Sequence, residues 1–422
     1  MPCFHPFFVK HKEWIALNLN RILKCTGSLA LTGLLAALTA LPCAALEENE
    51  TVFPGDEPEE IETFDFGEYQ YSILMDSEDS TKQAACIEHY KGSETDLVIP
   101  EEMDGLPVVA LGDHAFVDYP MLQTVTLPKT LVGVGTYTFA NCRSLREYIV
   151  PEDSEYFTVE DGVLYGEEGG YLVRYPVGKA PKTYTVKEGV FDIGCSAFAC
   201  CDTLESVTLP DSLLYLGEAA FTECTALKSV TLPDGIEELE AVTFFGCTAL
   251  ESVTMPAKLT KIGAACFART AIKEVTLPDT LTSIGQAAFA ATALKEVTIP
   301  ASVTEIGYSA FGWNLNAREE FELNSDFVIH GYAGSAAQTY ASDAENGNSF
   351  AFEPVDAESK PADNSDDKQP PVTVDPVELQ EDDGLSTGRV LGIIGCCAAL
   401  VAIVCFVIAS VVRGKKQNKG GE

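Results

Sequence analysis

The chain has 422 residues, 46% of them hydrophobic, and a formal net charge of −37. A surface this acidic repels nucleic-acid phosphates and anionic lipid headgroups, which argues against nucleic acid as a partner. Cationic partners stay open, although solubility alone accounts for such a charge.

The first 66 residues are predicted to precede the folded part of the chain. Residues 1–45 have the organisation of a secretory signal peptide, because basic residues precede an apolar run over 29–41 and Cys43-Ala44-Ala45 supplies small residues for cleavage. Residues 46–66 are acidic and contain two prolines, which is typical of a disordered spacer.

Residues 67–95 are predicted to form an N-terminal cap. Two strand-like runs, over residues 69–74 and 84–90, indicate a hairpin. A solenoid needs an atypical unit to cover its first coil, and we interpret this hairpin as that unit.

A repeat of 22 or 23 residues dominates residues 96–322. Such a period indicates a solenoid, in which each coil buries its apolar face against its neighbours. Earlier coils begin near residues 96, 122, 145 and 184, so we number the coils one to nine. The five most regular coils begin with Leu204-Glu-Ser-Val-Thr-Leu-Pro210, Leu227-Lys-Ser-Val-Thr-Leu-Pro233, Leu250-Glu-Ser-Val-Thr-Met-Pro256, Ile272-Lys-Glu-Val-Thr-Leu-Pro278 and Leu294-Lys-Glu-Val-Thr-Ile-Pro300, and a phenylalanine follows each proline 11 residues later.

Each coil is predicted to contribute one strand to a parallel sheet. In coil five, Leu204, Val207 and Leu209 should point inward. Thr208 should face solvent, and Pro210 should end the strand because it has no N–H group for the ladder.

The second half of each coil is predicted to be a tight bend. A glycine recurs in most coils, as at Gly217, which indicates a positive φ or a close approach between backbones. Glu240 interrupts this glycine column, so its coil should be locally distorted. The pair Ala220-Phe221 is predicted to form a single helical turn.

Coil three is interrupted by an insertion at about residues 152–183. Two β-rich runs around Gly169-Gly170 predict a hairpin that projects from the solenoid.

Four cysteines share one position of the coil, three residues after the phenylalanine. A column tied to coil geometry favours packing, since a free cysteine behaves as a small buried hydrophobe. Disulfides between adjacent coils are the alternative, because export permits them. The column consists of Cys142, Cys201, Cys224 and Cys247.

The C-terminal part is predicted to hold a cap, a tether and a membrane span. Residues 323–352 no longer follow the repeat and are predicted to form the C-terminal cap. Within them, Ser335-Ala-Ala-Gln338 has the pattern of a capping box and predicts a helix through about Ala344. Residues 353–388 form an acidic, proline-containing tether. Residues 390–412 carry no charge and are long enough to span a bilayer, and the basic tail 413–422 should stay cytoplasmic with the ectodomain outside.

Three features resemble the BspA-like leucine-rich repeat family of bacterial surface proteins. They are the coil pattern Leu-x-x-Val-x-Leu-Pro-x-x-Leu-x-x-Ile-Gly-x-x-Ala-Phe-x-x-Cys, the insert that begins Phe157-Thr-Val-Glu-Asp-Gly-Val-Leu-Tyr165, and the ending Gly331-Tyr-Ala-Gly-Ser-Ala-Ala-Gln-Thr-Tyr-Ala341. The resemblance covers about residues 67–353. It implies a right-handed leucine-rich-repeat solenoid with a parallel sheet on one side, and a role in attachment to matrix proteins, mucosal surfaces or other microbes. It transfers no binding residue. The chain has no sortase-type Leu-Pro-x-Thr-Gly signal, so the span itself is the expected anchor.

No catalytic or metal-binding motif occurs in the sequence. The expected ectodomain has three histidines, His89, His114 and His330, in unrelated repeat positions, and the common hydrolase, metalloprotease and phosphate-binding motifs are missing. We therefore predict a protein that is not an enzyme and has no cofactor or metal.

The solvent face of the strands is the first candidate binding surface. Repeat proteins use such extended faces for partners. The alternative is that threonine simply suits exposed strands and that the charges stabilise neighbouring strands as cross-strand pairs. The candidate residues are Thr126, Thr208, Thr231, Thr254, Thr276, Thr298, Lys228 and Glu251.

The insertion supplies the second candidate surface. Aromatic side chains are frequent anchors at interfaces, which draws attention to Tyr165, Tyr171 and Tyr175. The alternative is that these tyrosines pack the hairpin onto the solenoid.

The sequence leaves two functions open. The first is a membrane-anchored surface protein that binds protein or glycan ligands in adhesion. The second is a structural protein that binds other envelope components of its own cell.

Overall fold

A computed structural model describes residues 61–75, 82–166, 169–179, 181–316, 321–344 and 347–355, all within one compact unit. The predicted signal peptide, most of the acidic spacer, most of the tether and the predicted span over residues 390–412 lie outside the described residues. Within the described ranges, no helix combines the length and the apolar character needed to cross a bilayer.

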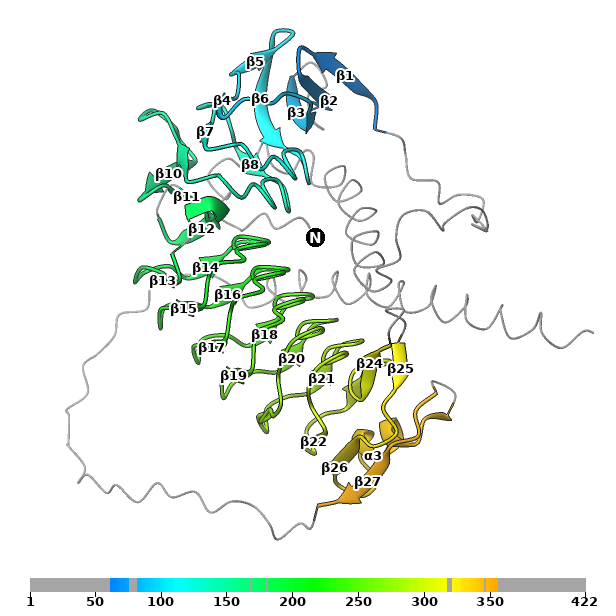
Figure 1. Cartoon of the computed structure of the whole chain (residues 1–422). Coiled ribbons are helices and arrows are strands. Elements are labelled where there is room, and N and C mark those ends of the chain that lie inside the picture. The colour runs from blue at the N-terminus through cyan, green and yellow to red at the C-terminus, as the bar shows by residue number, and fades with distance from the viewer. Residues whose placement is uncertain are drawn as a thin grey trace, which may run out of the picture. The chain divides into compact units, whose positions relative to one another are not determined.

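The N-terminal strands form an antiparallel sheet that joins the first coil (Figure 1). Strands β2 (Tyr69–Met75) and β3 (Gln83–Tyr90) pair antiparallel, so the predicted hairpin is present, and β1 (Thr63–Phe66) adds to its edge. Strand β3 then runs parallel to β6 (Leu106–Leu111) of coil one. The short strand β5 (Glu102–Met103) pairs antiparallel with β6.

The predicted strand of each coil forms the first of two rows of parallel strands. The row has three hydrogen-bonded groups, because the ladder is interrupted after coil three and again around residues 274–276. The groups are β4 (Asp96–Val98), β7 (Thr124–Thr126) and β9 (Glu147–Ile149); β13 (Thr183–Thr185), β15 (Ser206–Thr208), β17 (Ser229–Thr231) and β19 (Ser252–Thr254); and β22 (Glu296–Thr298), β26 (Val328–Gly331) and β27 (Ala351–Pro354).

A second row of parallel strands corrects the prediction of a single sheet. Its strands follow the proline of each coil, and most have only two residues, too few to show an alternating pattern in the sequence. Figure 1 shows several of them as successive rungs of the stack. They are β8 (Gly133–Val134), which pairs β6; β14 (Asp192–Ile193) and β16 (Tyr215–Leu216), which pair each other; and β18 (Glu238–Leu239), β20 (Lys261–Ile262), β21 (Ser283–Ile284) and β23 (Glu305–Ile306).

A column of stacked phenylalanines forms the centre of the core. Successive rings from coil four to coil nine lie 4.8–5.5 Å apart between centroids and are nearly parallel. Each ring is at most 1% exposed, so one coil cannot lose its ring without exposing two neighbours to a void. The column is Phe198, Phe221, Phe244, Phe267, Phe289 and Phe311.

The bend that carries each phenylalanine is a turn, so the predicted helical turn at Ala220-Phe221 is wrong. Ala219 and Glu223 have φ of 59° and 58°. Two residues in the left-handed region this close together prevent a right-handed helical turn.

The recurrent glycines allow the backbones of adjacent coils to approach closely. A Cβ atom at Gly217, Gly263 or Gly285 would lie 2.5 Å from a backbone nitrogen of the preceding coil. None of these three glycines has a positive φ. Of the two predicted reasons for the glycine column, close approach between backbones is therefore the one that applies. At Glu240, which carries a Cβ, the second row is interrupted between β16 and β18, as the predicted distortion requires.

Replacing Gly285 with alanine is expected to lower the free energy of unfolding by about 1–3 kcal/mol, the usual cost of overpacking. The added methyl group would meet the backbone nitrogen of Ala264, which cannot rotate away. Glu240→Ala is the matched control, since that position already accommodates a Cβ. Urea unfolding followed by circular dichroism measures both variants, and equal effects would contradict the close-approach explanation.

The insertion in coil three is part of the stack, which corrects the prediction that it projects. Strands β10 (Phe157–Glu160), β11 (Val163–Gly166) and β12 (Tyr171–Arg174) pair antiparallel in that order. Strand β12 then runs parallel to β14, so it serves as the second-row strand of coil three. The hairpin stays packed within the stack because its apolar side chains, such as Leu164 and Leu172, are fully buried.

The last elements follow coil nine. Strands β24 (Trp313–Leu315) and β25 (Phe321–Leu323) pair antiparallel, and helix α3 (Ala336–Ala341) is a shorter form of the predicted helix. The predicted capping box is not formed, because Ser335 makes no side-chain cap bond and Gln338 Oε1 instead accepts from Gly334 N at 2.7 Å. Tyr340 bonds both backbone groups of Phe311, which ties the helix to the end of the phenylalanine column.

Candidate functional site

The threonines of the first strand row face solvent but do not form one continuous ladder. Thr208, Thr231 and Thr254 are exposed on β15, β17 and β19, and Thr231 lies directly beside Thr254. Thr276 is exposed outside any strand, and Thr298 lies beside His330 of β26. The six candidate threonines therefore do not form one continuous binding surface of paired strands.

The interruption at Thr276 coincides with the loss of one residue per coil. In coils of 23 residues the Cys224 and Cys247 thiols donate to a phenylalanine carbonyl of the preceding coil at 3.1 Å. In the two shortened coils Thr270 and Thr292 replace cysteine, and their hydroxyls donate to a carbonyl of their own coil. The link between coils at this position is lost just where the ladder stops.

The charged residues beside the threonines pair with one another across the strands. Glu205 lies 2.6 Å from Lys182 and 2.5 Å from Lys228, and Lys273 lies 3.3 Å from Glu251. Hydrogen bonds from Lys182 and Lys228 lower the pKa of Glu205 to about 2. This pairing supports the alternative that the predicted site residues Lys228 and Glu251 stabilise neighbouring strands.

Two exposed apolar side chains on the same face were missed by the sequence prediction. Val98 and Ile149 flank Thr126 in the pairing of β4, β7 and β9, and they are 67% and 41% exposed. They occupy the threonine position of coils one and three, so reading that repeat position through all coils would have found them. Together these three residues give the first coils a β-branched outer column, beside the exposed carboxylates of Asp96 and Glu147 on the same strands.

The hairpin tyrosines lie mainly inside the molecule. Tyr165 and Tyr175 are each 2% exposed, and Tyr171 is partly buried. Tyr165 OH lies 3.1 Å from Tyr184 OH, and the Tyr175 ring stacks 5.0 Å from Phe198. These contacts favour the alternative that the tyrosines pack the hairpin, with Tyr175 extending the phenylalanine column.

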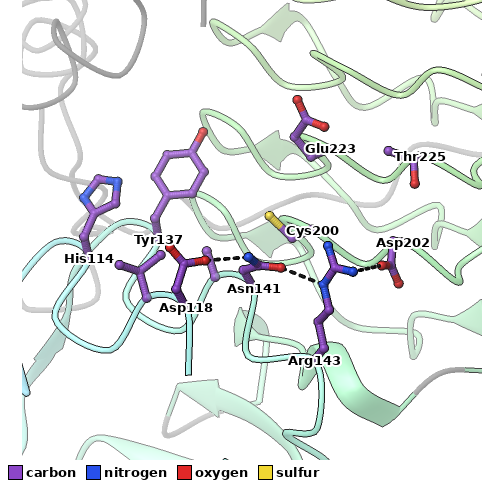
Figure 2. A pocket seen from close by; sticks show the side chains of 11 residues that line it. His114, Asp118, Tyr137, Asn141, Arg143, Cys200, Asp202, Glu223 and Thr225 are labelled. Carbon is purple, nitrogen blue, oxygen red and sulfur yellow. Dashed lines mark hydrogen bonds and ion pairs between the residues drawn. The ribbon is translucent and has the colours of Figure 1, made fainter. Parts of the chain in front are cut away.

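A pocket of about 400 Å³ opens at the insertion (Figure 2). Its walls come from the bends of coils one and two on one side and of coils four and five on the other, and no described residue of coil three lines it. The bend of coil three is shortened, since three residues lead from Leu172 to the stacked Tyr175 whereas five lead from the paired Ile193 to Phe198. The pocket therefore occupies the place of a missing outer bend.

A polar chain crosses the floor of the pocket from coil one to coil four, as Figure 2 shows. Asn141 Nδ2 donates to Asp118 Oδ1 at 2.5 Å, and Arg143 Nε donates to Asn141 Oδ1 at 2.7 Å. Arg143 Nη1 then lies 3.4 Å from Asp202 Oδ2. This side-chain network links coils one and two to coil four across the missing outer bend.

The remaining lining combines aromatic rings, a thiol and a carboxylate. The rings of His114 and Tyr137 stack 5.2 Å apart, and burial lowers the pKa of His114. Burial raises the pKa of Glu223, with Arg269 opposing the shift. Burial also raises the pKa of the Cys200 thiol to about 11, so this thiol is no nucleophile at neutral pH.

A buried arginine holds the backbone together behind the pocket. Arg174 is 4% exposed, and its guanidinium donates to the carbonyls of Val173 at 2.7 Å, Cys195 at 2.5 Å and Gly135. Within the described ranges no carboxylate lies at ion-pair distance from it. Burial lowers the pKa of Arg174. The guanidinium thus donates to one carbonyl of coil two and one of coil four, at a level of the stack where coil three offers no backbone N–H group to them.

The cysteine column is a packing feature. Cys142, Cys201, Cys224 and Cys247 are free thiols that are at most 2% exposed, which agrees with the packing interpretation. In the part of the chain that the structure describes, no cluster of three or more His, Cys, Asp or Glu side chains is arranged to hold a metal ion.

Comparison with known proteins identifies the repeats. The model of the BspA type leucine rich repeat region matches six copies over residues 91–164 and 192–318. No curated protein is similar enough to count as a match. Among solved structures, a leucine-rich repeat protein from Bacteroides ovatus is 22% identical, covers 69% of this chain and 76% of its own, and has a TM-score of 0.39. A leucine-rich repeat protein from Eubacterium ventriosum is 21% identical over 49% and 68% of the two chains, with a TM-score of 0.40. A leucine rich cell surface protein from Faecalibacterium prausnitzii is 19% identical over 71% and 96%, with a TM-score of 0.26. Residues 91–164 and 192–318 are thus BspA-type leucine-rich repeats.

Proposed function

We propose that this chain is a cell-surface protein that binds partner proteins through the outer face of its first strand row and serves in attachment. Leucine-rich repeats of this type are binding scaffolds, and protein binding is the activity that the family supports. The proposal adds three points to protein binding: export of the chain, its anchoring in the membrane, and a role in attachment.

The observation that carries the proposal is a column of exposed, uncharged β-branched side chains along the outer face of the first row, at the last position of each strand. Its central side chains are the exposed residues Thr208, Thr231 and Thr254, and Val98 and Ile149 continue the same position in the first coils. Exposed β-branched residues lose little side-chain entropy on binding, since they have few rotamers. The charges beside them already pair with one another, so a partner meets a pre-organised face.

The sequence supports the location of this face outside the cell. The signal-peptide pattern of residues 1–45 directs export, and the uncharged run 390–412 with its basic tail supplies a single C-terminal anchor. The acidic tether 353–388 then separates the solenoid from the membrane. Protease treatment of intact cells should remove the solenoid while a C-terminal tag stays protected, and protection of both would contradict this topology.

Binding is tested by titrating the purified full-length chain against arrayed matrix proteins, mucins and cell-wall proteins at low and high salt. The face variant Thr231→Lys/Thr254→Lys places two bulky cations on adjacent exposed strand positions. A saturable hit should weaken at least about tenfold in this variant, equivalent to about 1.4 kcal/mol.

The matched control is Thr248→Lys, which adds a cation to an exposed bend of the same solenoid. It should leave the affinity within about twofold, a shift of less than about 0.5 kcal/mol. Binding only to cell-wall proteins of the producing cell would favour the structural function instead. No saturable protein partner would overturn the proposal.

A further inference from the structure

The pocket at coil three lies where the backbone hydrogen bonds between successive bends are interrupted. Elsewhere the bends bond directly from coil to coil, as Phe116 N does to Thr138 O at 2.9 Å and Cys200 N to Thr222 O at 2.8 Å. Within the described ranges, the corresponding N–H groups of Tyr137 and Phe139 make no such bond to coil three. Side chains bridge the two sides instead, since Tyr137 is hydrogen-bonded to Thr222 and the Cys200 thiol to the backbone of Asn141.

One wall of the pocket is a column of equivalent residues. Asp118, Asn141, Cys200 and Glu223 each lie two residues after the phenylalanine of their coil, and all have φ between 58° and 64°. Their side chains line the opening from both sides of the gap. The repeat thus sets hydrogen-bonding groups at equivalent positions on both sides of the pocket.

The charges of the pocket restrict what it can hold. Three carboxylates, on Asp118, Asp202 and Glu223, repel an anion. A cation meets the Arg143 guanidinium, which already pairs with Asp202, and Asp118 is bonded to Asn141. Each of these groups keeps further lone pairs or N–H donors, which suits a neutral ligand that can both donate and accept.

The shape and the aromatic rings narrow the class further. The stacked rings of His114 and Tyr137 offer apolar area beside the polar floor, and the volume of about 400 Å³ lies within the range of small-molecule sites. A sugar ring combines an apolar C–H face with a rim of hydroxyls, each both donor and acceptor. We infer that this pocket binds a neutral sugar ring of a glycan, an inference that rests on the proposed surface function and adds a second ligand class to it.

The test uses the purified full-length chain and methyl glycosides of glucose, galactose, mannose and N-acetylglucosamine. Glucuronic acid and lysine amide serve as anionic and cationic probes. Saturation-transfer NMR detects binding, and calorimetry measures the affinity. At least one neutral glycoside should bind, and the two charged probes should not.

Two variants locate the site. Thr225→Trp fills the mouth of the pocket without removing a polar lining group other than its own hydroxyl, and should weaken glycoside binding at least about tenfold, or 1.4 kcal/mol. Thr248→Trp makes the same change one coil further on, outside the pocket lining, and should leave binding within about twofold, less than about 0.5 kcal/mol. Circular dichroism shows whether both variants keep the wild-type fold.

Three outcomes would overturn the inference: no neutral glycoside binds, a charged probe binds in its place, or Thr225→Trp binds the glycoside as well as wild type does. None of them touches the proposed protein binding, which is measured with protein partners and the Thr231→Lys/Thr254→Lys variant. Loss of protein binding in that variant, together with intact glycoside binding, would separate the two surfaces.

Discussion

Replacing Phe244 with alanine is expected to lower the free energy of unfolding by about 4 kcal/mol. The Phe244 ring is fully buried and stacks between Phe221 and Phe267, at 5.5 and 5.4 Å with interplanar angles of 1° and 4°. Its removal leaves a cavity with a bare ring on either side. Two stacking contacts are lost as well, each worth about 0.5–1.5 kcal/mol. Urea unfolding followed by circular dichroism measures the change.

Phe64→Ala is the control for this prediction. Phe64 lies on the edge strand β1 and is 36% exposed, so its truncation leaves no closed cavity. Because repeat arrays can unfold in parts, hydrogen exchange should also show increased opening in coils five to seven for Phe244→Ala. A loss of less than about 1 kcal/mol at Phe244, small beside the usual cost of such a truncation, would contradict a continuous phenylalanine core.

Replacing Arg174 with methionine is expected to cost about 3 kcal/mol, because it leaves three carbonyls without their donor at about 1–3 kcal/mol for each buried unsatisfied group. Methionine keeps most of the side-chain volume, so the loss reports hydrogen bonding rather than a cavity. Removal of the buried charge offsets part of the cost. Thermal and urea unfolding measure the net effect.

Arg143→Met is the control for the buried arginine. The Arg143 side chain is 64% exposed and its ion pair with Asp202 is long, so its loss should cost at most about 1 kcal/mol. If Arg174→Met were as stable as wild type, the guanidinium would not be what joins coils two and four.

The repeated part of the fold could be predicted from the sequence because it depends on local patterns. The strand at Val207 and the buried position of Phe221 follow from a fixed period and from alternation within five residues. The glycine column at Gly217 is also visible in the sequence, but only the structure decides between a positive φ and a close approach. The second strand row could not be predicted, because strands such as β20 (Lys261–Ile262) are too short to carry a pattern.

The non-repeated part of the site could not be predicted, because it depends on contacts distant in sequence. Arg174 bonds to the carbonyls of Gly135 and Cys195, which lie 39 and 21 residues away. No local pattern around Arg174 could have predicted these two partners. The pocket arises from a shortened bend, which becomes visible only when Tyr175 is seen to stack on Phe198. Residue type alone left Tyr165 open as either an interface anchor or a packing residue, and its contact with Tyr184 favours packing.

Protein binding by the outer face is tested by one titration series of the full-length chain against the protein partner found in the screen. The series compares wild type with the face variant Thr231→Lys/Thr254→Lys and the pocket variant Thr225→Trp. If the outer face of the first strand row is the protein-binding surface, the face variant loses at least about tenfold in affinity, or 1.4 kcal/mol, and the pocket variant binds like wild type. Unchanged binding by the face variant, or loss confined to Thr225→Trp, would contradict it.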